Sequence, residues 1–520
     1  MKKWRSILEV ISSKFVCAIA VIILASFSFW TGVYTHMTYV DLENLKVRLY
    51  EDRIGANIGW LVIVAAVLFI ISKIVLRKDE NVNQKRVRLI AIAMALIAGV
   101  VSLIWVVIHN YVPDHDQLQI VVNAKSFLDK DYSDLKGYLE IFPYQIGLVY
   151  MYKILFSFWA NVEIIYFVHV IWIMVIVYFT YAVTEELFGN SIMSLYSIFG
   201  AISFVPMYFY VNYAYGDLSM AALGVLGIWG FIKLCKSGKG RWAFFLIGVM
   251  TVSFLARSNA MIVMIAMFLV LFVYGISLKN WRMLLVSVLL IGVPLVSQQV
   301  LLEGYQRIAK VEMVKGSPAV LSVAMGMQDT YEGPGYYNAY NLTVYVNAGK
   351  NAEAAAKIGK EYVSDRIQEF SQNLSYAKNF YLTKIWQQWN EPSFGGEVST
   401  KTFAEEPEEF VQYIYFGKGQ EFLRIFRNRY IFILYAGAFL GAVHKLLARK
   451  EDDSIWTNLI FVILIGGFLF SILWENKSRY VMPYVVMLIP YSLYGLYHLQ
   501  LLICRAVQTI KKKVASKRKV

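Results

Sequence analysis

The sequence predicts an all-α polytopic membrane protein, and three observations lead to this fold class. The chain has 520 residues, of which 58% are hydrophobic. Uncharged apolar runs of about 20 residues recur along it, the length that an α-helix needs to cross the hydrocarbon core of a bilayer. Only brief charged stretches separate these runs. Soluble folds bury short apolar runs too, but they do not need so many long ones.

About twelve transmembrane helices are expected. The first follows the basic start "MKKWR" without a clear small-residue cleavage site, so it is expected to be a retained helix. The seventh is short and ends at Arg257. In chain order, the predicted spans are 15–34, 57–76, 89–108, 163–186, 191–210, 217–235, 243–256, 260–277, 284–302, 428–447, 456–474 and 480–503.

The charge of the loops orients these spans. Lys and Arg gather at the start of the chain, in the loops "RKDENVNQKRVR", "KSGKGR" and "LKNWR", and in the tail "KKKVASKRKV". Such an excess is typical of cytoplasmic loops. Both termini are therefore predicted to be cytoplasmic, in a plasma membrane protein whose functional site lies on the extracytoplasmic side. Because topology explains the net charge of +14, nucleic acid is not an expected partner.

The three cysteines lie far apart in or beside apolar runs, which suggests neither a disulfide framework nor a zinc cluster. The stretch "FPYQIGLVYMYKILFSFWA", residues 142–160, is apolar enough for a short span but contains Lys153. If this stretch crossed the membrane, the basic loop "KSGKGR" would lie outside the cytoplasm. It is therefore predicted to be a juxtamembrane or re-entrant helix at the outer face, with tyrosines and Trp159 suited to the interface.

The pattern divides the chain into three regions. Residues 1–302 form an N-terminal transmembrane region with an Asp-containing outer loop at 109–162, and residues 428–520 form a C-terminal transmembrane region with a basic cytoplasmic tail. Residues 303–427 lack a long apolar run and are expected to form a small extracytoplasmic mixed domain. This domain combines helical periodicity at 350–389 with the turn-rich "GMQDTYEGPGYYNAYN".

Two aspartates follow the third span in "YVPDHDQLQI". Asp114 and Asp116 alternate after Pro113, so one of them is expected to face a cavity at the membrane edge while the other caps a helix that begins at Gln117. A carboxylate there can act as a general base that takes the proton of a hydroxyl acceptor. A pair of ordinary loop charges, with Asp116 as the N-cap, fits the position equally well.

A divalent metal is a further interpretation of this loop. His109, Asp114, His115 and Asp116 carry ligating groups. Their spacing matches no fixed zinc signature, and hard cations usually collect carboxylates from several segments. No metal ligand is assigned, and metal dependence stays open.

Two arginines at predicted outer edges suggest an anionic lipid head group. Arg479 lies in "LWENKSRYVMPY" beside Tyr480, and Arg257 interrupts an apolar stretch in "FLARSNAMI". A guanidinium can bind phosphate with two hydrogen bonds, whereas simple anchoring at the interface is the alternative. A charge at the position of Arg257 is costly and usually partnered, which strengthens the functional interpretation.

Several polar and aromatic residues are candidates for binding the transferred group. The loop "WQQWNEPSFGG" combines indole rings with an amide, a carboxylate and a Gly-rich turn, which suits a loop that covers a sugar, although interfacial anchoring is the commoner use of such tryptophans. The predicted substrate-binding residues are Tyr144, Gln145, Trp389, Asn390, Glu391 and Glu475.

Together these segments resemble the GT-C superfamily of membrane glycosyltransferases, in particular the bacterial group related to protein O-mannosyltransferases and lipid A aminoarabinose transferases. "PDHDQLQIVVNAKSFLDKDYSDLKGYLEIFPYQIGLVY" is similar to that family's first long outer loop, and "RYVMPYVVMLIP" is similar to its late Arg-Tyr-x-x-Pro element. The loop reads Asp-His-Asp-Gln where the family often has Asp-Glu, which leaves open which aspartate is catalytic. The amphipathic continuation after Asp116 favours that residue.

The resemblance implies transfer of a sugar from a polyprenyl phosphate carrier to an extracytoplasmic glycan, lipid or protein, with inversion at the anomeric carbon. In that mechanism Asp116 or Asp114 activates the acceptor, and Arg479, Arg257 and Tyr480 bind the donor phosphate. A flippase or transporter of lipid-linked saccharides, and an oligosaccharide polymerase or ligase, are the rival functions. A flippase predicts charges spread through the helix centres rather than gathered at the outer rim.

Overall fold

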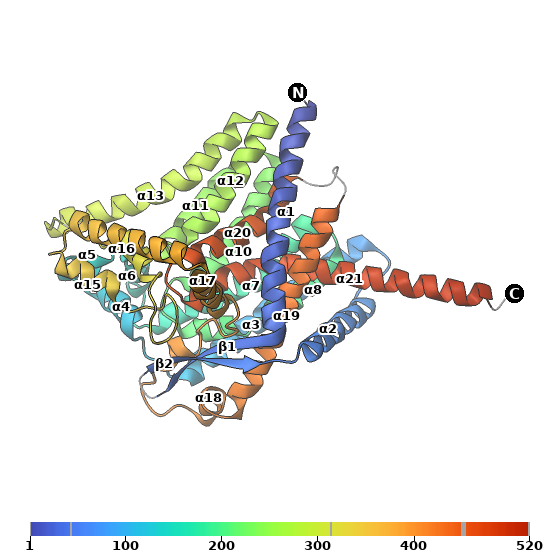
Figure 1. Cartoon of the computed structure of the whole chain (residues 1–520), viewed down its shortest axis with the longest axis horizontal. Helices are drawn as coiled ribbons and strands as arrows, with labels where there is room; N and C mark the ends of the chain where they lie inside the picture. The colour runs from blue at the N-terminus through green and yellow to red at the C-terminus, as the bar shows by residue number, and fades with distance from the viewer. Residues whose placement is uncertain (1, 42–43, 313–314, 449–453, 518–520) are drawn as a thin grey trace.

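The computed structural model describes residues 2–41, 44–312, 315–448 and 454–517, and helices dominate it (Figure 1). Within the described residues, 10 helices are long and apolar enough to cross a membrane. They are α1 (Lys2–Val33), α2 (Ile54–Val75), α3 (Glu80–His109), α7 (Glu163–Phe188), α10 (Asp217–Ser237), α12 (Ala260–Leu278), α13 (Trp281–Ala309), α19 (Lys418–Leu447), α20 (Leu459–Leu473, extended by the turn η6, Ile455–Asn458) and α21 (Met482–Lys517). The protein is thus a multi-pass α-helical membrane protein.

All twelve predicted spans coincide with helices, but two of them are not complete straight crossings. The fifth is a pair, α8 (Ser191–Ile202) and α9 (Pro206–Phe209) with the turn η3 (Tyr210–Asn212), which bends by 46°. The break lies at residues 203–205, and Pro206 occupies the first turn of α9, where its missing N–H leaves no helical hydrogen bond unmade. The seventh, α11 (Gly240–Ala256), has only 17 residues. The count is therefore 10, or 11 if the bent pair is one span, rather than about twelve.

The segment 142–160 contains no helix long enough to cross a bilayer. Its longest helix, α6 (Ile146–Phe156), has 11 residues, which at about 1.5 Å per residue covers roughly half the hydrocarbon core. The helix α4 (His115–Leu128) and the short turns η1 (Ser133–Lys136), α5 (Tyr138–Ile141) and η2 (Pro143–Gln145) precede it.

The mixed domain predicted at 303–427 is wrong in its secondary structure, because the described residues there form helices and loops without a strand. The helices are α14 (Ala319–Met325), α15 (Tyr340–Asn347), α16 (Ala352–Gln372), α17 (Leu374–Trp389), the turn η4 (Val398–Thr400) and α18 (Glu409–Tyr415). The turn-rich stretch at 326–341 closes on itself through the isolated bridge between Asp329 and Pro334. The two strands instead form a hairpin after α1, β1 (Tyr34–Asp41) paired antiparallel with β2 (Asn44–Glu51).

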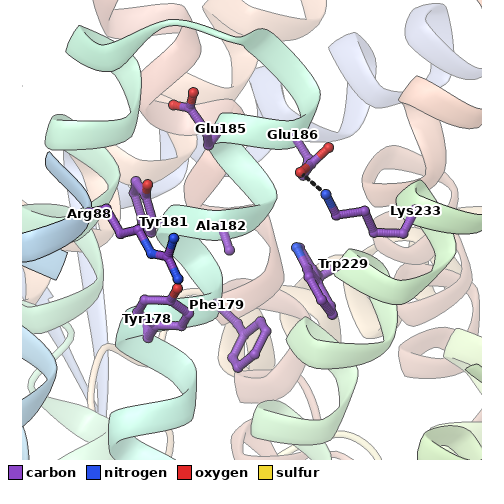
Figure 2. A pocket seen from close by; sticks show the side chains of 9 residues that line it. All are labelled: Arg88, Tyr178, Phe179, Tyr181, Ala182, Glu185, Glu186, Trp229 and Lys233. Carbon is purple, nitrogen blue, oxygen red and sulfur yellow. Dashed lines mark hydrogen bonds and ion pairs between the residues drawn. The ribbon is translucent and has the colours of Figure 1, made fainter. Parts of the chain in front are cut away.

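Loops from distant parts of the chain meet at the two ends of the helices. At the end predicted to be outside, the backbone N–H of His36 donates to Asn390 (3.2 Å) and that of Val112 to Thr402 (3.0 Å). At the other end, Ser191 N–H donates to the Glu80 carboxylate (3.0 Å). A groove of about 400 Å³ between α3, α7 and α10 opens near this second end (Figure 2).

Cysteine labelling is expected to show which end faces outward. In a variant without the three native cysteines, we expect a membrane-impermeant maleimide added to intact cells to label cysteine at Lys136 and Glu353, and to label cysteine at Lys239 only after permeabilisation. All three positions are exposed. Labelling at position 239 alone in intact cells would reverse the predicted orientation.

Candidate functional site

Two arginines that are distant in the sequence lie together at the predicted outer end of the helices. Arg257 caps the C-terminus of α11, and Arg479 lies in the short turn η7 (Ser478–Tyr480) before α21. Both are buried, with 8% and 7% of their surface exposed. The guanidinium carbons of Arg257 and Arg479 lie 4.5 and 5.4 Å from the ring of Tyr215, and each lies 5.4 Å from the ring of Tyr480. The structure thus brings together the three residues predicted to bind a phosphate.

The loop "YAYGD" at the start of α10 completes this cluster, and the sequence analysis did not single it out. Asp217 Oδ1 lies 3.3 Å from Arg257 Nη2, and Arg479 Nη1 donates to the hydroxyl of Tyr213. A Cβ on Gly216 would lie 2.0 Å from the carbonyl oxygen of Ala256, so only glycine lets this loop pack beside Arg257. An acidic residue at the start of an apolar span was the available signal, because such a charge needs a partner.

The two arginines have one directly paired carboxylate between them among the described residues. Arg257 has its carboxylate partner in Asp217, whereas within the described part of the chain Arg479 forms no ion pair. The Nε–H groups of both arginines are buried without a hydrogen-bond partner among the described residues. A buried guanidinium without a counter-charge is costly, so an anion bound between the two arginines would stabilise the site.

Glu475 and Lys477 flank the cluster. The hydroxyl of Tyr480 donates to Glu475 Oε2 at 2.9 Å, and Lys477 Nζ lies 3.1 Å from Glu475 Oε1. Burial raises the pKa of Tyr480 far above its usual value, and the charge of Glu475 raises it further. Tyr480 therefore stays a neutral phenol that is oriented by Glu475.

A buried lysine behind the cluster was not predicted from the sequence. Lys384 on α17 is completely buried, and its Nζ donates to the carbonyl oxygens of Gly326 (2.5 Å) and Ile472 (2.9 Å). Burial lowers the pKa of Lys384 to about 7, although Glu475 opposes the shift. In the sequence it looks like one more lysine on an amphipathic helix, so only tertiary packing reveals its burial.

The lowered pKa of Lys384 predicts how stability changes with pH. Between pH 7 and 10 the unfolded chain holds the Lys384 proton while the folded protein has lost it, so stability should increase as pH rises, by up to about 1.4 kcal/mol per pH unit. In detergent, the melting temperature of the native protein is expected to rise from pH 7 to pH 9 relative to that of Lys384→Met. An equal change of melting temperature with pH in the two proteins would contradict this prediction.

The two aspartates of the outer loop face different neighbours. Asp114 is tied to other loop residues: Thr402 Oγ1 donates to it at 2.6 Å, Gln117 Nε2 at 3.2 Å and the hydroxyl of Tyr111 at 3.3 Å. Asp116 accepts only one long hydrogen bond within the described residues, from Tyr138 at 3.4 Å. The N-cap of α4 is Asp114, and the helix begins at His115 rather than at Gln117.

Asp116 lies near Tyr215, the ring that both arginines approach. Burial raises the pKa of Tyr215, the negative charge of Asp116 raises it further, and Arg257 and Arg479 oppose this rise. The phenol of Tyr337 is half exposed. Burial raises its pKa, and the negative charges of Asp116 and Glu475 raise it further. The ring of Tyr215 thus lies among the half-buried carboxylate of Asp116, the guanidinium groups of Arg257 and Arg479, and the neutral phenol of Tyr480.

Two of the predicted substrate-binding residues lie at the edge of this cluster. Gln145 Nε2 donates to the hydroxyl of Tyr215, and Gln145 itself is buried. Tyr144 remains 42% exposed, and its phenol interacts with the charges of Arg257 and Asp116. Tyr144 and Tyr337 therefore form an open aromatic rim beside the buried arginines.

Tyr215→Phe is expected to weaken the site modestly. The ring under both arginines remains, but the hydrogen bond with Gln145 is lost, which costs about 0.5–1.5 kcal/mol. We expect the affinity of the purified protein for an anionic ligand of this cluster to fall about two- to tenfold, with little change in expression. An unchanged affinity would mean that the hydroxyl does not position the arginines.

Three predicted substrate-binding residues are buried against protein rather than exposed to a ligand. Trp389 is 1% exposed, stacks on Phe27 at 4.8 Å and donates to Ser471 Oγ at 3.0 Å. Asn390 Nδ2 donates to the carbonyl oxygen of Tyr34 at 2.8 Å. The predicted sugar-covering role of this stretch is therefore not supported, because the same aromatic and polar residues fix α17 to α1 and α20.

Glu391 is likewise enclosed, and it holds the loop that supports Arg479. Its carboxylate accepts from Ser393 Oγ (2.6 Å), Gly395 N–H (2.7 Å) and Ser478 Oγ (3.0 Å). Burial raises the pKa of Glu391, and these donors oppose the shift. Because Ser478 directly precedes Arg479, Glu391 positions the arginine without touching an open surface.

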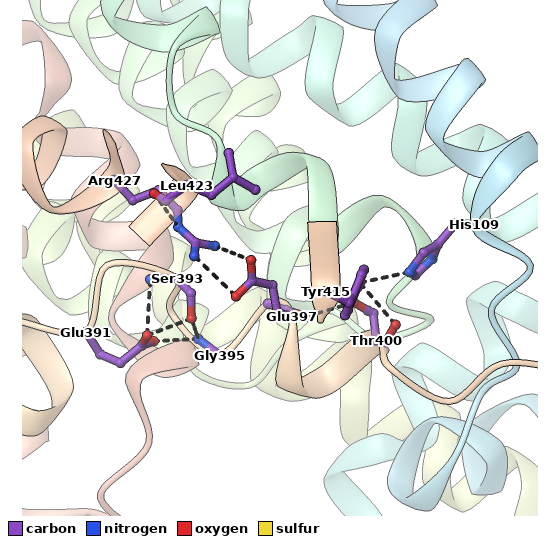
Figure 3. Close-up of polar contacts among 10 residues, drawn as sticks. His109, Glu391, Ser393, Gly395, Glu397, Thr400, Tyr415, Leu423 and Arg427 are labelled. Atoms are coloured by element: carbon purple, nitrogen blue, oxygen red, sulfur yellow. Dashed lines mark hydrogen bonds and ion pairs between the residues drawn. The ribbon is translucent and has the colours of Figure 1, made fainter. Parts of the chain in front are cut away.

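A buried polar network continues from this loop to α3 (Figure 3). Arg427 Nη1 pairs with Glu397 Oε1 at 2.8 Å, and both side chains are buried. Further along, the hydroxyl of Tyr415 lies 2.8 Å from both Thr400 Oγ1 and His109 Nε2. His109 therefore serves this network, and no three His, Cys, Asp or Glu side chains in the described chain form a group that could hold a metal.

Neither a scan of protein-family models nor a search of curated proteins finds a match to this chain. The fold and the arginine cluster place this chain in a structural class: it is a multi-pass α-helical membrane protein with buried arginines at one end of its helices.

Proposed function

We propose that this protein is a membrane glycosyltransferase, which transfers a sugar from a polyprenyl phosphate carrier to an extracytoplasmic glycan, lipid or protein. The observation that carries the proposal is the pair of buried arginines, Arg257 and Arg479, of which only Arg257 has a carboxylate partner among the described residues. Asp116 lies on the same side of the cluster. A lipid phosphate and a hydroxyl acceptor are the reactants that suit these groups.

In the proposed reaction, Asp116 takes the proton of the acceptor hydroxyl while the hydroxyl oxygen attacks the anomeric carbon. The bond between that carbon and the phosphate oxygen breaks, and the phosphate leaves with the electron pair, so the anomeric configuration inverts. Arg479 and Arg257 stabilise the negative charge that develops on the leaving oxygen. The hydrogen bond that Arg479 Nη1 donates to the hydroxyl of Tyr213 keeps Arg479 in place.

The aromatic rim offers a place for the sugar. Tyr144 and Tyr337 are about half exposed, at 42% and 47%, beside the buried arginines. Lys477 lies 5.6 Å from the ring centre of Tyr337 and pairs with Glu475, which keeps the polar groups of this rim ordered. Ring faces pack on the apolar faces of a sugar, while the carboxylates accept bonds from its hydroxyls.

The distribution of charge along the helices supports an enzyme more than a flippase. The middle parts of α7, α12 and α21 contain no Asp, Glu, Lys or Arg. A path for a charged head group through the bilayer would need polar or ionisable side chains at those depths. In this chain the charged candidates lie instead at the helix ends.

The test is a transfer assay with the purified full-length protein in nanodiscs of defined lipid. We expect lipid extracted from the protein to contain a polyprenyl phosphate by mass spectrometry, and the protein to cleave an added polyprenyl phosphate sugar and release the free carrier phosphate. Release of a carrier diphosphate would indicate a polymerase or ligase. Movement of intact donor across vesicles without cleavage would contradict the proposal and favour a flippase.

A further inference from the structure

A second site lies far from the arginine cluster, in the groove between α3, α7 and α10 (Figure 2). Its volume is about 400 Å³. The helix α7 forms its floor, α3 contributes one edge and α10 the other (Figure 2). The lining residues are Arg88, Tyr178, Phe179, Tyr181, Ala182, Glu185, Glu186, Trp229 and Lys233.

The groove changes from polar to apolar along the helices. Glu186 and Lys233 lie within one turn or so of the ends of α7 and α10, whereas Phe179 and Trp229 lie deeper, and their rings are 5.2 Å apart. The seven helical steps from Phe179 to Glu186 cover about 10 Å along the helix. A ligand that fills the groove therefore needs a polar head and an apolar chain.

One cation that lines the groove, Arg88 beside Tyr178, is available for a ligand (Figure 2). Glu186 pairs with both Lys233 and Lys236, and Glu185 accepts from Ser194 Oγ at 2.6 Å. Arg88 is exposed, and within the described residues it forms no ion pair or hydrogen bond. Arg88 is therefore the unpaired cation among the described charged residues that line the groove.

We propose that this groove binds an anionic glycerophospholipid of the leaflet predicted to be cytoplasmic. The phosphate pairs with Arg88, and an acyl chain lies along Phe179 and Trp229. A lipid suits this groove better than a soluble anion, because the surface beside it is apolar. Leu89, next to Arg88, is 68% exposed, as expected for a side chain that faces acyl chains. Basic pockets between transmembrane helices on the cytoplasmic side are suited to anionic head groups.

This site is independent of the proposed glycosyltransferase function. Arg88, Glu186 and Lys233 lie at the helix ends opposite to Arg257 and Asp217. The lipid would hold α3, α7 and α10 together by filling the space between them. Its loss should therefore reduce stability without removing a group from the arginine cluster.

Native mass spectrometry of the full-length protein tests the proposal. The protein is placed in nanodiscs with equal amounts of phosphatidylglycerol and phosphatidylcholine, and the lipid retained after release is identified. We expect one phosphatidylglycerol to be retained, with affinity about fivefold lower in Arg88→Gln. The matched control Lys85→Gln removes an exposed basic residue one turn away that does not line the groove, and it should retain the lipid.

Any one of four results would overturn the proposal. Equal retention of the two lipids, or equal retention by Arg88→Gln and the native protein, would show that Arg88 does not select an anionic head group. Displacement of the lipid by inorganic phosphate would indicate a site for a soluble anion. Displacement by polyprenyl phosphate at a lower concentration than by phosphatidylglycerol would assign the groove to the carrier instead.

Discussion

Replacing Asp116 by asparagine is expected to lower sugar transfer by about a hundredfold to ten-thousandfold, the usual contribution of a general base. The amide has nearly the shape of the carboxylate, so only basicity and charge are lost. Asp116 accepts a single 3.4 Å hydrogen bond, from Tyr138, among the described residues, so its loss should not unfold the loop. Initial rates at saturating donor should fall while donor binding, measured separately, stays nearly unchanged.

Asp114→Asn is the matched control, because it makes the same change two residues away. Asp114 accepts from Thr402, Gln117 and Tyr111, so its replacement should lower the melting temperature and leave most of the transfer activity. An inactive Asp114→Asn beside an active Asp116→Asn would exchange the two roles. Full activity in both variants would remove the outer loop from the mechanism.

The transmembrane helices were predictable because their signal is local. A run of apolar residues between charged loops specifies a span without reference to the rest of the chain, and all twelve predicted spans are helical. The number of complete crossings was not predictable in the same way, since the bend before Pro206 depends on how α8 and α9 pack. The hairpin was missed because its two 8-residue strands lie between long apolar runs that dominate the pattern of this part of the chain.

The candidate site was predictable only where a charge stood out against an apolar background. Arg257 and Arg479 were found in this way, because a charge at a membrane edge costs free energy and is usually kept for a function. Burying Asp217 or Lys384 also costs free energy. In the sequence, however, Asp217 resembles an ordinary acidic residue at a helix start, and Lys384 resembles an exposed lysine on an amphipathic helix. Trp389 was misjudged because its residue type suits both an open sugar-binding loop and a packed helix contact, and only its 1% exposure separates the two.

Arg479→Ala is expected to reduce donor affinity or turnover about ten- to a hundredfold, since it removes a charge-assisted contact worth roughly 1.5–3 kcal/mol. Arg479→Lys should keep part of the activity. Lysine retains the charge but cannot lie flat against the rings of Tyr213, Tyr215 and Tyr480, which lie 5.4–5.7 Å from the guanidinium carbon. Transfer measured against donor concentration in defined lipid gives the KM and kcat of each variant.

Arg424→Ala provides the comparison for a buried arginine outside the cluster. Arg424 also packs on an aromatic ring, that of Tyr50 at 4.2 Å, but it is paired with Glu421 through bonds of 2.8 and 2.6 Å. Its replacement should change stability without changing the KM for the donor. If Arg479→Ala behaves in the same way, Arg479 is a structural anchor at the membrane edge, and the phosphate-binding role falls to Arg257, whose own replacement would then have to raise the KM.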